Sequence, residues 1–398
     1  MKKSLFTLGA VGVLAAGLAF PSDAADKHIV LVAGTPSHGP GDHEFNAGCL
    51  VLKKCLDQVP GVKTTVHLNG WPKEANALDG ADAILLFMDG GGGHPAIKED
   101  RLQALGALMK KGVGLGCAHY GVEVPKEKGG PEFLDWIGGY YETAFSTNPH
   151  WDADIKNLPK HPITRGVKPF KIRDEWYFNM RFRPEMKGVT PILVAKPDDE
   201  TRLGKSASPR GPYPHIVAAS GREETLMWAT ERPDGGRGFG FTGGHMHANW
   251  ANANFRKVVL NGLLWLAKMD VPADGTQTSL PLEEYTKNLD PKRPAPTGAN
   301  ITGAWNFQVE SPNGTGTPSF TFVHAGPNIV GTYKGLFGEA EFSGSLRNQE
   351  LKFAFDVRVE EQPVTVTYQG KVESDGTMKG TARFGELGDA TWTAKKAP

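Results

Sequence analysis

Through the first two thirds of the chain, short apolar runs alternate with amphipathic segments. Residues 28–33 (HIVLVA) form a largely β-branched run, which is typical of a strand covered on both faces. A helix is predicted from about 43 to 56, with Asp42 as its N-cap. The next predicted elements are strands over 63–68 and 83–88, a helix over 98–111 and a strand over 113–117. This alternation predicts an α/β fold with a parallel, doubly wound sheet.

The pattern is less regular after this point, and the strands it predicts are 192–195, 216–218 and 226–229. A Gly-rich segment over 237–242 leads into the loop 243–247, and a helix over 255–267 closes a domain that we place at residues 25–270. Residues 271–299 are rich in Pro, Thr and Lys and have no sustained apolar period, which is typical of a linker.

From residue 300 onward the pattern changes to short alternating strands separated by Gly, Asn or Asp turns. About eight such strands between 301 and 394 predict a small all-β antiparallel barrel, up-and-down or calycin-like, over residues 300–398. Trp305 and Trp392 lie near its two ends and could plug or close it. This part shows no catalytic constellation, so we expect an accessory or carbohydrate-binding role.

The N-terminus has the features of a secretory signal peptide over residues 1–24: two lysines, an apolar segment and a small-x-small cleavage site. No other stretch is long and apolar enough to cross a bilayer. Lys+Arg and Asp+Glu number 44 each, so the chain has no basic field for nucleic acid or an anionic membrane. We therefore expect a soluble periplasmic or secreted protein with no nucleic-acid partner and no membrane anchor, whose oligomeric state stays open.

The three cysteines do not form a disulfide or zinc-finger pattern. Cys49 and Cys55 are six apart on one predicted helix, where their side chains point in different directions. Cys117 lies within a predicted strand. We expect three buried thiols.

Histidines recur in the loops that follow predicted strands. The stretch 112–123 (GVGLGCAHYGVE) predicts a sharp turn that exposes His119 at the carboxyl edge of the sheet, where open α/β sheets bind ligands. Taken alone, His119 could equally be a satisfied core histidine. Because parallel strands bring their loops to one rim, distant histidines can converge there, and neutral imidazoles suit zinc and other first-row divalent ions. The other histidines in such loops are His38, His43, His94, His245 and His247.

Carboxylates accompany these loops. Asp42, Glu44 and Glu123 could serve as further ligands, as hydrogen-bond partners of the ligands or as a general base. The segment 174–177 (DEWY) could bring a carboxylate and a phenol near the cleft, or it could be a strand with partly exposed polar residues.

Other candidates have a structural alternative. His94 could be no more than a part of the Gly-rich turn 90–93, which lacks the GK[ST] of a phosphate-binding loop. His247 could be a surface partner. His38 and His43 are five apart, which is not the spacing of a zinc-protease helix. Cys117 could be the nucleophile of a Cys–His pair, but its place before the turn favours a buried strand thiol.

Several motifs in order resemble the ThuA-like (trehalose utilisation) family: the loop with His38 and His43, GVGLGCAHYGVE, HPITRGV, DEWY and GGHMHANWAN…FRKVVLNGLLWL. The resemblance covers roughly residues 27–270 and leaves the barrel outside. It implies a fold similar to class I glutamine amidotransferases, with a flavodoxin-like, doubly wound, mostly parallel sheet. Amidotransferases carry a nucleophilic Cys at the elbow, whereas the ThuA-like pattern carries His, here His119, which argues against amidotransferase activity.

The resemblance also implies carbohydrate metabolism, with oxidised (3-keto) sugars or glycosides as a substrate class, and a divalent metal in some members. We therefore expect an exported metal-dependent enzyme that acts on a carbohydrate substrate by elimination, isomerisation or hydrolysis. The alternatives are a non-catalytic carbohydrate-binding protein and a Cys-dependent amidase. The expected ligands of the metal ion, zinc first, are His38, His43, His119 and His245. The expected catalytic residues are His119, Glu123 and Glu44. The expected substrate-binding residues are Asp42, Tyr120, Glu175, Tyr177 and His247.

Overall fold

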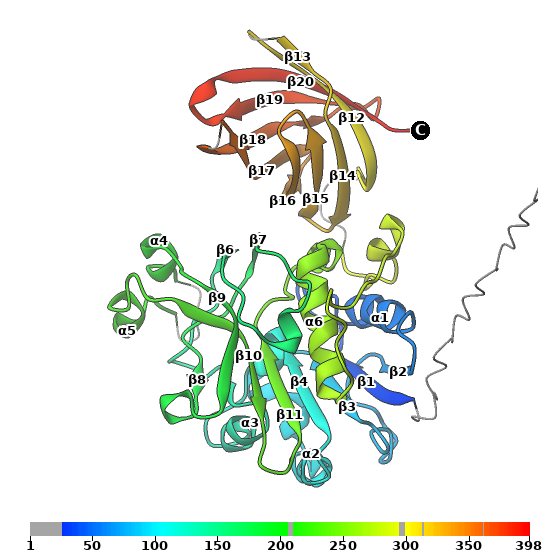
Figure 1. The fold of residues 1–398 in the computed structure, drawn as a ribbon, viewed down its shortest axis with the longest axis vertical. Helices are drawn as coiled ribbons and strands as arrows, with labels where there is room; N and C mark the ends of the chain where they lie inside the picture. Colours follow the sequence, from blue (N-terminus) through cyan, green and yellow to red (C-terminus); the bar gives the residue numbers. More distant parts are fainter. Residues whose placement is uncertain (1–25, 206–209, 294–298, 313, 361) are drawn as a thin grey trace, which may run out of the picture.

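The structure is a computed structural model that describes residues 26–205, 210–293, 299–312, 314–360 and 362–398. The predicted signal peptide at 1–24 lies outside the described residues. Two domains are stacked along the long axis of the molecule, with an α/β domain below and a β-barrel above (Figure 1). No helix in the described part of the chain has the length and apolar character needed to span a membrane.

A seven-stranded sheet forms the centre of the α/β domain, in the order β2-β1-β3-β4-β11-β10-β9. Its first five strands run parallel, and the two antiparallel pairings at the other edge, β11 with β10 and β10 with β9, make the sheet mixed. The α/β class and the parallel-rich sheet are therefore confirmed. The strands are β1 (Lys27–Ala33), β2 (Val62–His67), β3 (Ala83–Phe87), β4 (Gly114–Ala118), β9 (Val189–Ala195), β10 (Glu224–Glu231) and β11 (Arg237–Phe241).

Helices cover both faces of this sheet because its strands are apolar on both sides. In β1, Ile29 and Leu31 join a core cluster with α1 (Phe45–Leu56) and α6 (Ala253–Leu266). The alternate residues Val30 and Val32 join a second cluster with α2 (Arg101–Lys110) and α3 (Gly130–Trp136). The two shorter helices are α4 (Asp199–Arg202) and α5 (Pro214–Val217).

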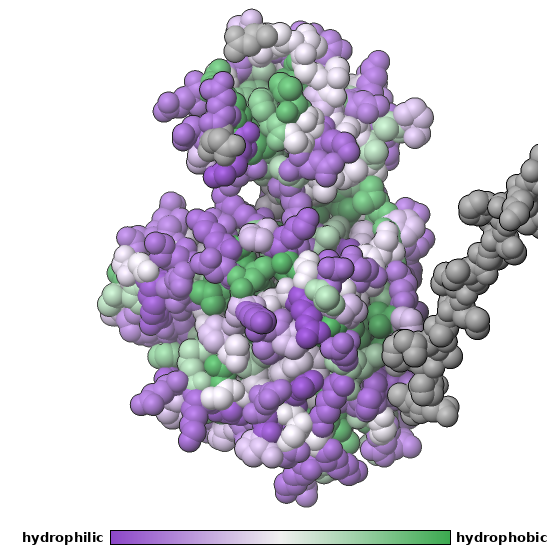
Figure 2. Space-filling model, in the orientation of Figure 1, coloured by the Kyte–Doolittle hydropathy of each residue, from purple (hydrophilic) through white to green (hydrophobic). Residues whose placement is uncertain are grey.

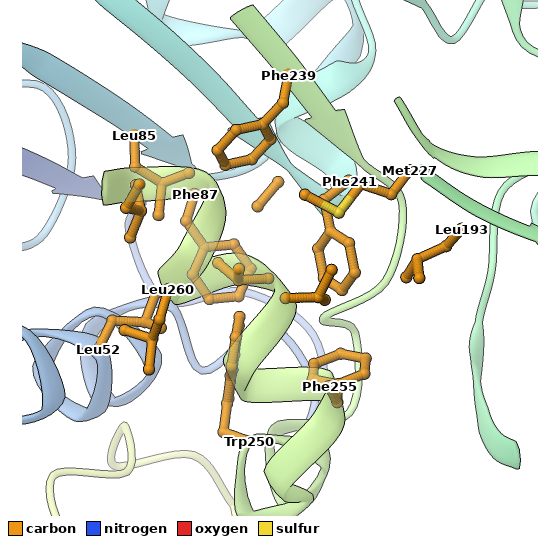
Figure 3. Packing of buried hydrophobic residues seen from close by; sticks show 14 of the residues in the cluster. Leu52, Leu85, Phe87, Leu193, Met227, Phe239, Phe241, Trp250, Phe255 and Leu260 are labelled. Atoms are coloured by element: carbon orange, nitrogen blue, oxygen red, sulfur yellow. The ribbon is translucent and has the colours of Figure 1, made fainter. Parts of the chain in front are cut away.

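Aromatic rings fill the core between the sheet and α6. Phe87 of β3 lies 5.7 Å from Trp250, and Phe241 of β11 lies 5.1 Å from Phe255, measured between ring centroids. Figure 3 shows these rings packed together with Leu52 and Leu260 from the helices. Such burial of large side chains fixes the strand ends from which the site loops leave.

Three sequence expectations differ from the structure. Asp42 does not cap α1, because the helix begins only after Glu44, and Asp42 forms a β-bridge with Met246 instead. Residues 216–218 do not form a strand, because Pro214 opens the short helix α5. The segment after 271 is not a free linker: it contains a 3-10 turn, η7 (Leu282–Thr286), and buries Tyr285 in the α/β core.

Two small pairs of strands flank the main sheet and were not predicted. β5 (Gly139–Tyr140) pairs with β8 (Arg181–Phe182), and β6 (His150–Ile155) pairs with β7 (Phe170–Glu175). The burial of β6 alternates strictly from exposed to buried, as expected for a strand with one face on the core.

The C-terminal domain is a closed eight-stranded antiparallel barrel, as predicted. Pairing of its first and last strands, β12 and β20, closes it, and the short β13 (Gly314–Gly316) extends one edge. Trp392 packs inside, 4.9 Å from Phe307, and Trp305 is also buried. The barrel strands are β12 (Gly303–Ser311), β14 (Ser319–Ala325), β15 (Asn328–Gly335), β16 (Gly338–Arg347), β17 (Glu350–Val359), β18 (Gln362–Val372), β19 (Met378–Phe384) and β20 (Asp389–Lys396).

Candidate metal centre

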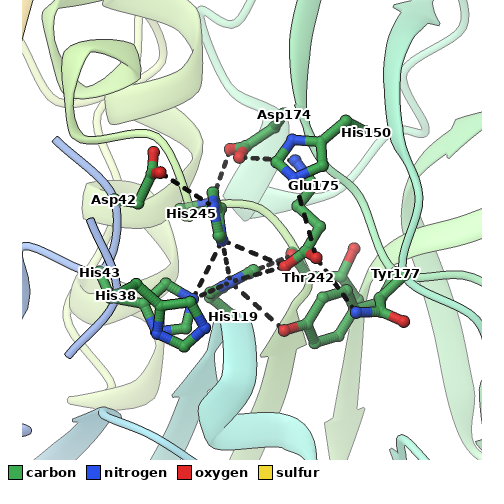
Figure 4. Close-up of polar contacts among 12 residues, drawn as sticks. His38, Asp42, His43, His119, His150, Asp174, Glu175, Tyr177, Thr242 and His245 are labelled. Atoms are coloured by element: carbon green, nitrogen blue, oxygen red, sulfur yellow. Dashed lines mark hydrogen bonds and ion pairs between the residues drawn. The ribbon is translucent and has the colours of Figure 1, made fainter. Parts of the chain in front are cut away.

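Three histidines and a glutamate from four separate elements meet at the carboxyl ends of the parallel strands. His43 follows β1, His119 follows β4 and His245 follows β11, while Glu175 ends β7. One nitrogen or oxygen atom from each of them lies within 4.8 Å of all the others (Figure 4). The parallel sheet thus gathers the strand-end loops, as the sequence pattern indicates.

The spacing of these atoms fits a small metal ion. Nε2 of His119 lies 3.0 Å from Nε2 of His43 and 3.2 Å from Nδ1 of His245. Oε2 of Glu175 lies 3.1 Å from Nδ1 of His245 and 3.5 Å from Nε2 of His119. Four ligand atoms placed tetrahedrally around zinc would be about 3.3 Å apart. The donor set, imidazoles with one carboxylate, also suits zinc and its neighbours.

Oxygen atoms behind the histidines determine which nitrogen faces inward. Each oxygen accepts a hydrogen bond or ion-pair contact from the outer ring nitrogen, so a neutral imidazole keeps its proton there and presents a lone pair to the centre. The outer contacts are His43 Nδ1 with Asp89 Oδ1 at 2.8 Å, His119 Nδ1 with the Thr242 carbonyl at 3.1 Å, and His245 Nε2 with Asp42 Oδ2 at 3.7 Å. Three lone pairs that point at one another repel unless a cation lies between them.

The electrostatics of the metal-free protein agree with this assignment. Burial lowers the pKa of His43 far below its usual range, and the neighbouring imidazoles lower it further, so His43 is neutral. Burial also lowers the pKa of His245, but the carboxylates of Asp42 and Glu175 outweigh burial and raise it to about 10. A proton on His245 therefore occupies the place of a cation, and a metal ion would displace it.

The backbone is strained where the histidines enter the site. His43 has φ 49° and His119 has φ 51°, in the left-handed region that favours glycine. The sharp turn predicted after β4 is therefore present. Exposure of His119 was also predicted, and that is wrong: the side chain is buried, with Tyr177 3.3 Å from its Nε2.

His38 lies beside the centre rather than in it. Its ring stacks on His43 at 3.6 Å, and it forms a second group of possible ligands with His43 and Asp89. Ser37 Oγ lies 3.0 Å from its Nδ1. His38 is exposed, so it could contact a ligand at the mouth of the site.

Of the other expected site residues, Tyr177 and Tyr120 lie beside the histidines, and Glu123 lies close enough to Glu175 for the charge of Glu175 to act on it. The Tyr120 ring lies 6.0 Å from that of His43. Glu123 accepts a hydrogen bond from Thr143 Oγ1 at 3.2 Å. Burial raises the pKa of Glu123 to about 7, which is the range of a general acid or base at neutral pH.

Two expected residues have structural contacts instead. Glu44 is buried, accepts a hydrogen bond from Gly41 N at 2.9 Å and pairs with Lys292 at 3.1 Å. His247 is neither a surface partner nor part of the cluster, because it is buried with its Nε2 2.7 Å from the Tyr285 carbonyl. His94 is likewise buried and bonds the Gly121 carbonyl at 3.1 Å.

The structure changes the role expected for one residue and adds two residues that the sequence reasoning did not assign. Glu175, expected to bind substrate, is the carboxylate of the histidine cluster. His150 starts β6, with its ring 4.9 Å from that of His245. Asp174 accepts hydrogen bonds from Gly244 N and Met246 N and so fixes the loop of His245. The polar alternation of residues 150–155 was the available signal for His150.

The three cysteines are free and buried, as predicted. Cys117 packs in the core cluster on the α2 and α3 side of the sheet, and burial raises the pKa of its thiol. The active nucleophile is the thiolate, so this environment opposes a catalytic role.

The fold and the site together define an α/β protein with a candidate metal centre at the carboxyl edge of its sheet. Residues 30–266 match the ThuA family, described as trehalose utilisation, and the chain belongs to this family. A solved structure of a putative ThuA-like protein from Bacteroides uniformis is 15% identical, with 62% of this chain and 95% of that chain covered and a TM-score of 0.45. None of the curated proteins matches the chain.

Proposed function

We propose that this chain is a metal-dependent enzyme that acts on a sugar or glycoside. The observation that carries the metal assignment is the set of three inward imidazole nitrogens, each fixed by an oxygen on its outer side. His43, His119, His245 and Glu175 would hold a divalent cation, zinc first. The description of the family, trehalose utilisation, supports a carbohydrate substrate.

A bound divalent cation would polarise a carbonyl or hydroxyl of the sugar, or acidify a water molecule. Glu123 is the group best suited to move a proton, because its pKa of about 7 lets it both accept and donate near neutral pH. Burial raises the pKa of Tyr177 well above its usual value, so its hydroxyl stays protonated and can donate a hydrogen bond beside His119.

This arrangement suits a 3-keto-glycoside. The hydrogen next to a sugar ketone is acidic enough for a carboxylate of raised pKa to remove, which leads to elimination or isomerisation. Hydrolysis fits the same residues, with Glu123 taking a proton from the attacking water. The expected leader at 1–24 supports export, so we propose a periplasmic or secreted enzyme.

Metal binding tests the proposal first. Calorimetric zinc titrations and metal analysis would compare the wild-type chain with His119→Ala and His245→Ala. His215→Ala, which removes an exposed histidine bonded to the Phe145 carbonyl, is the matched control. We expect the two cluster variants to bind zinc at least about 100-fold more weakly and the control to bind like the wild type. Unchanged metal content in both cluster variants would refute the metal centre.

Turnover separates an enzyme from a binding protein. The assay follows a 3-keto-glucoside by chromatography before and after chelation and again after zinc is restored. We expect product formation that chelation abolishes and zinc restores. Binding of the glycoside without turnover under all three conditions would favour the non-catalytic carbohydrate-binding alternative.

A further inference from the structure

The barrel is fitted closely onto the α/β domain. Gly326, at the turn between β14 and β15, approaches Pro40 so closely that a Cβ there would lie 1.9 Å from the Pro40 carbonyl oxygen. Asn328 Nδ2 donates to Asp42 Oδ1 at 2.9 Å, and Asn252 Nδ2 donates to Glu341 Oε2 at 2.8 Å. The apolar residues Val323, Ala325 and Val330 of the barrel belong to the core cluster of the α/β domain.

A cleft of about 560 Å³ lies beside this seam, between the two domains. Figure 2 shows that the molecule narrows to a waist where they meet. One wall is formed by β6 and β7 with the loops of Asp42 and Met246, and the other by β16, β17 and β18 of the barrel. The volume is within the range of about 300–1,000 Å³ that is usual for small-molecule sites.

The cleft lies next to the histidine cluster, because two of the residues that line it contact members of the cluster. Asp42 lines the cleft and contacts His245 of the cluster at 3.7 Å. His150 lines the cleft and lies 3.9 Å from Glu175 Oε1. A molecule bound in the cleft would therefore have one end beside the histidine cluster and the other end along the barrel.

The barrel wall of the cleft carries hydrogen-bonding groups that are free. Arg347, Lys352 and Gln369 are exposed and line the cleft, and none of the three side chains has a hydrogen-bond or ion-pair partner among the described residues. On the opposite wall, Arg173 is already paired with Asp152 at 2.9 Å. Guanidinium, ammonium and amide groups bind the hydroxyls of sugars and the carboxylates of uronic acids.

We infer that the barrel wall is a subsite for the second sugar of an oligosaccharide, whose first sugar lies at the histidine cluster. The substrate is then a disaccharide or a longer glycan, and the barrel is part of the substrate site rather than a separate module. This inference rests on the proposed carbohydrate function. It assigns Arg347, Lys352 and Gln369 to substrate binding.

A glycan array tests this subsite directly. The array carries mono-, di- and oligosaccharides of glucose, galactose, mannose and xylose, with and without uronic acids, and is probed with the full chain. The double variant Arg347→Ala/Lys352→Ala removes the free cations of the cleft. Lys334→Ala/Lys395→Ala removes two exposed barrel cations that do not line it and is the matched control. Thermal melting checks that both variants fold like the wild type.

We expect the wild type and the control to bind saccharides of two or more sugars, and the cleft variant to lose at least about 10-fold of that affinity. Loss confined to uronic-acid glycans would assign the cations to carboxylates, and loss on neutral glycans would assign them to hydroxyls. The inference is overturned if the cleft variant binds like the wild type, if only monosaccharides bind, or if no glycan binds.

Zinc titration of the same samples keeps the two proposals apart. If the cleft variant binds zinc like the wild type but loses oligosaccharides, the subsite is supported independently of the metal centre. If the wild type binds oligosaccharides through the cleft but binds no zinc, the metal-dependent function fails while the subsite stands.

Discussion

At the scale of single residues, the candidate site depends on hydrogen bonds behind the histidines as much as on the histidines themselves. Asp89, in the loop just after β3, accepts a hydrogen bond from the outer nitrogen of His43 at 2.8 Å and another from Ser37 Oγ at 3.0 Å. The carboxylate thus holds both the tautomer and the ring orientation of His43.

Replacing Asp89 should therefore weaken metal binding without removing any of the four proposed ligands His43, His119, His245 and Glu175. We expect Asp89→Ala to lower zinc affinity by about 10- to 100-fold, measured by competition with a zinc chelator. Asp89→Asn should lose less zinc affinity, because its amide oxygen can still accept a hydrogen bond from His43 Nδ1. Equal zinc affinity for wild type and Asp89→Ala would show that the His43 tautomer does not depend on this contact.

Glu123 gives a prediction about pH. Its folded pKa of about 7 lies above the usual 4.5, so between these values the unfolded chain ionises first and stability falls as pH rises. At pH 8 the buried carboxylate costs up to about 3 kcal/mol, whereas at pH 5 it costs little. Glu123→Gln removes this cost, so in metal-free protein the variant should melt several degrees above the wild type at pH 8 and close to it at pH 5. The same difference in melting temperature between variant and wild type at pH 5 and pH 8 would contradict the raised pKa of Glu123.

Some of the residues of the candidate site could be predicted from the sequence. His43, His119 and His245 follow parallel strands, so the rule that loops meet at the carboxyl edge brought them together correctly. Glu175 and His150 come from β6 and β7, a strand pair outside the main sheet, and no rule of parallel topology places its ends. Glu44 has the right residue type in the right loop, but Lys292, distant in sequence, holds its carboxylate.

At the scale of elements, β4 and the turn after it place the side chains of Cys117 and His119 in different surroundings. Successive residues of a strand face opposite sides, so Cys117 enters the core beneath α2 and α3, and the left-handed turn at His119 redirects the chain into the site. The helices and strands with strong periodicity were predicted to within a few residues. The short helix α5 was missed because its apolar residues fit a strand equally well.

Cys117→Ala tests this division of roles. We expect zinc affinity and glycoside turnover to stay at wild-type values, with a loss of about 1 kcal/mol in unfolding free energy from the small cavity. Cys49→Ala, which removes another buried thiol from the opposite core cluster, should behave in the same way. Urea denaturation measures the stability. Loss of turnover in a well-folded Cys117→Ala variant, with Cys49→Ala active, would instead support the amidase alternative.

At the scale of the whole molecule, the two domains meet beside the histidine cluster. Sequence patterns predicted a barrel and an α/β domain separately, because each has its own hydrophobic period. The contact between them depends on single positions, Gly326 against Pro40 and Asn328 on Asp42, which have no periodic signal. Through Asp42, this contact between the domains reaches His245 of the candidate metal centre.

Gly326→Ala should open the seam and weaken the centre together. The added Cβ would lie 1.9 Å from the Pro40 carbonyl oxygen, and φ 59° is itself unfavourable for alanine. Hydrogen exchange should quicken on both sides of the seam, in residues 38–42 and 326–330, and zinc affinity should fall by up to about 10-fold as Asp42 loses Asn328. Gly376 also has a positive φ, 81°, but a Cβ there would meet nothing within 4 Å. Gly376→Ala is therefore a control that carries the backbone strain without the clash. If hydrogen exchange in residues 38–42 and 326–330 is the same in both variants, the close approach of Gly326 does not hold the domains together. If exchange quickens only in Gly326→Ala while zinc affinity is unchanged, the barrel is joined to the α/β domain but does not support the candidate metal centre.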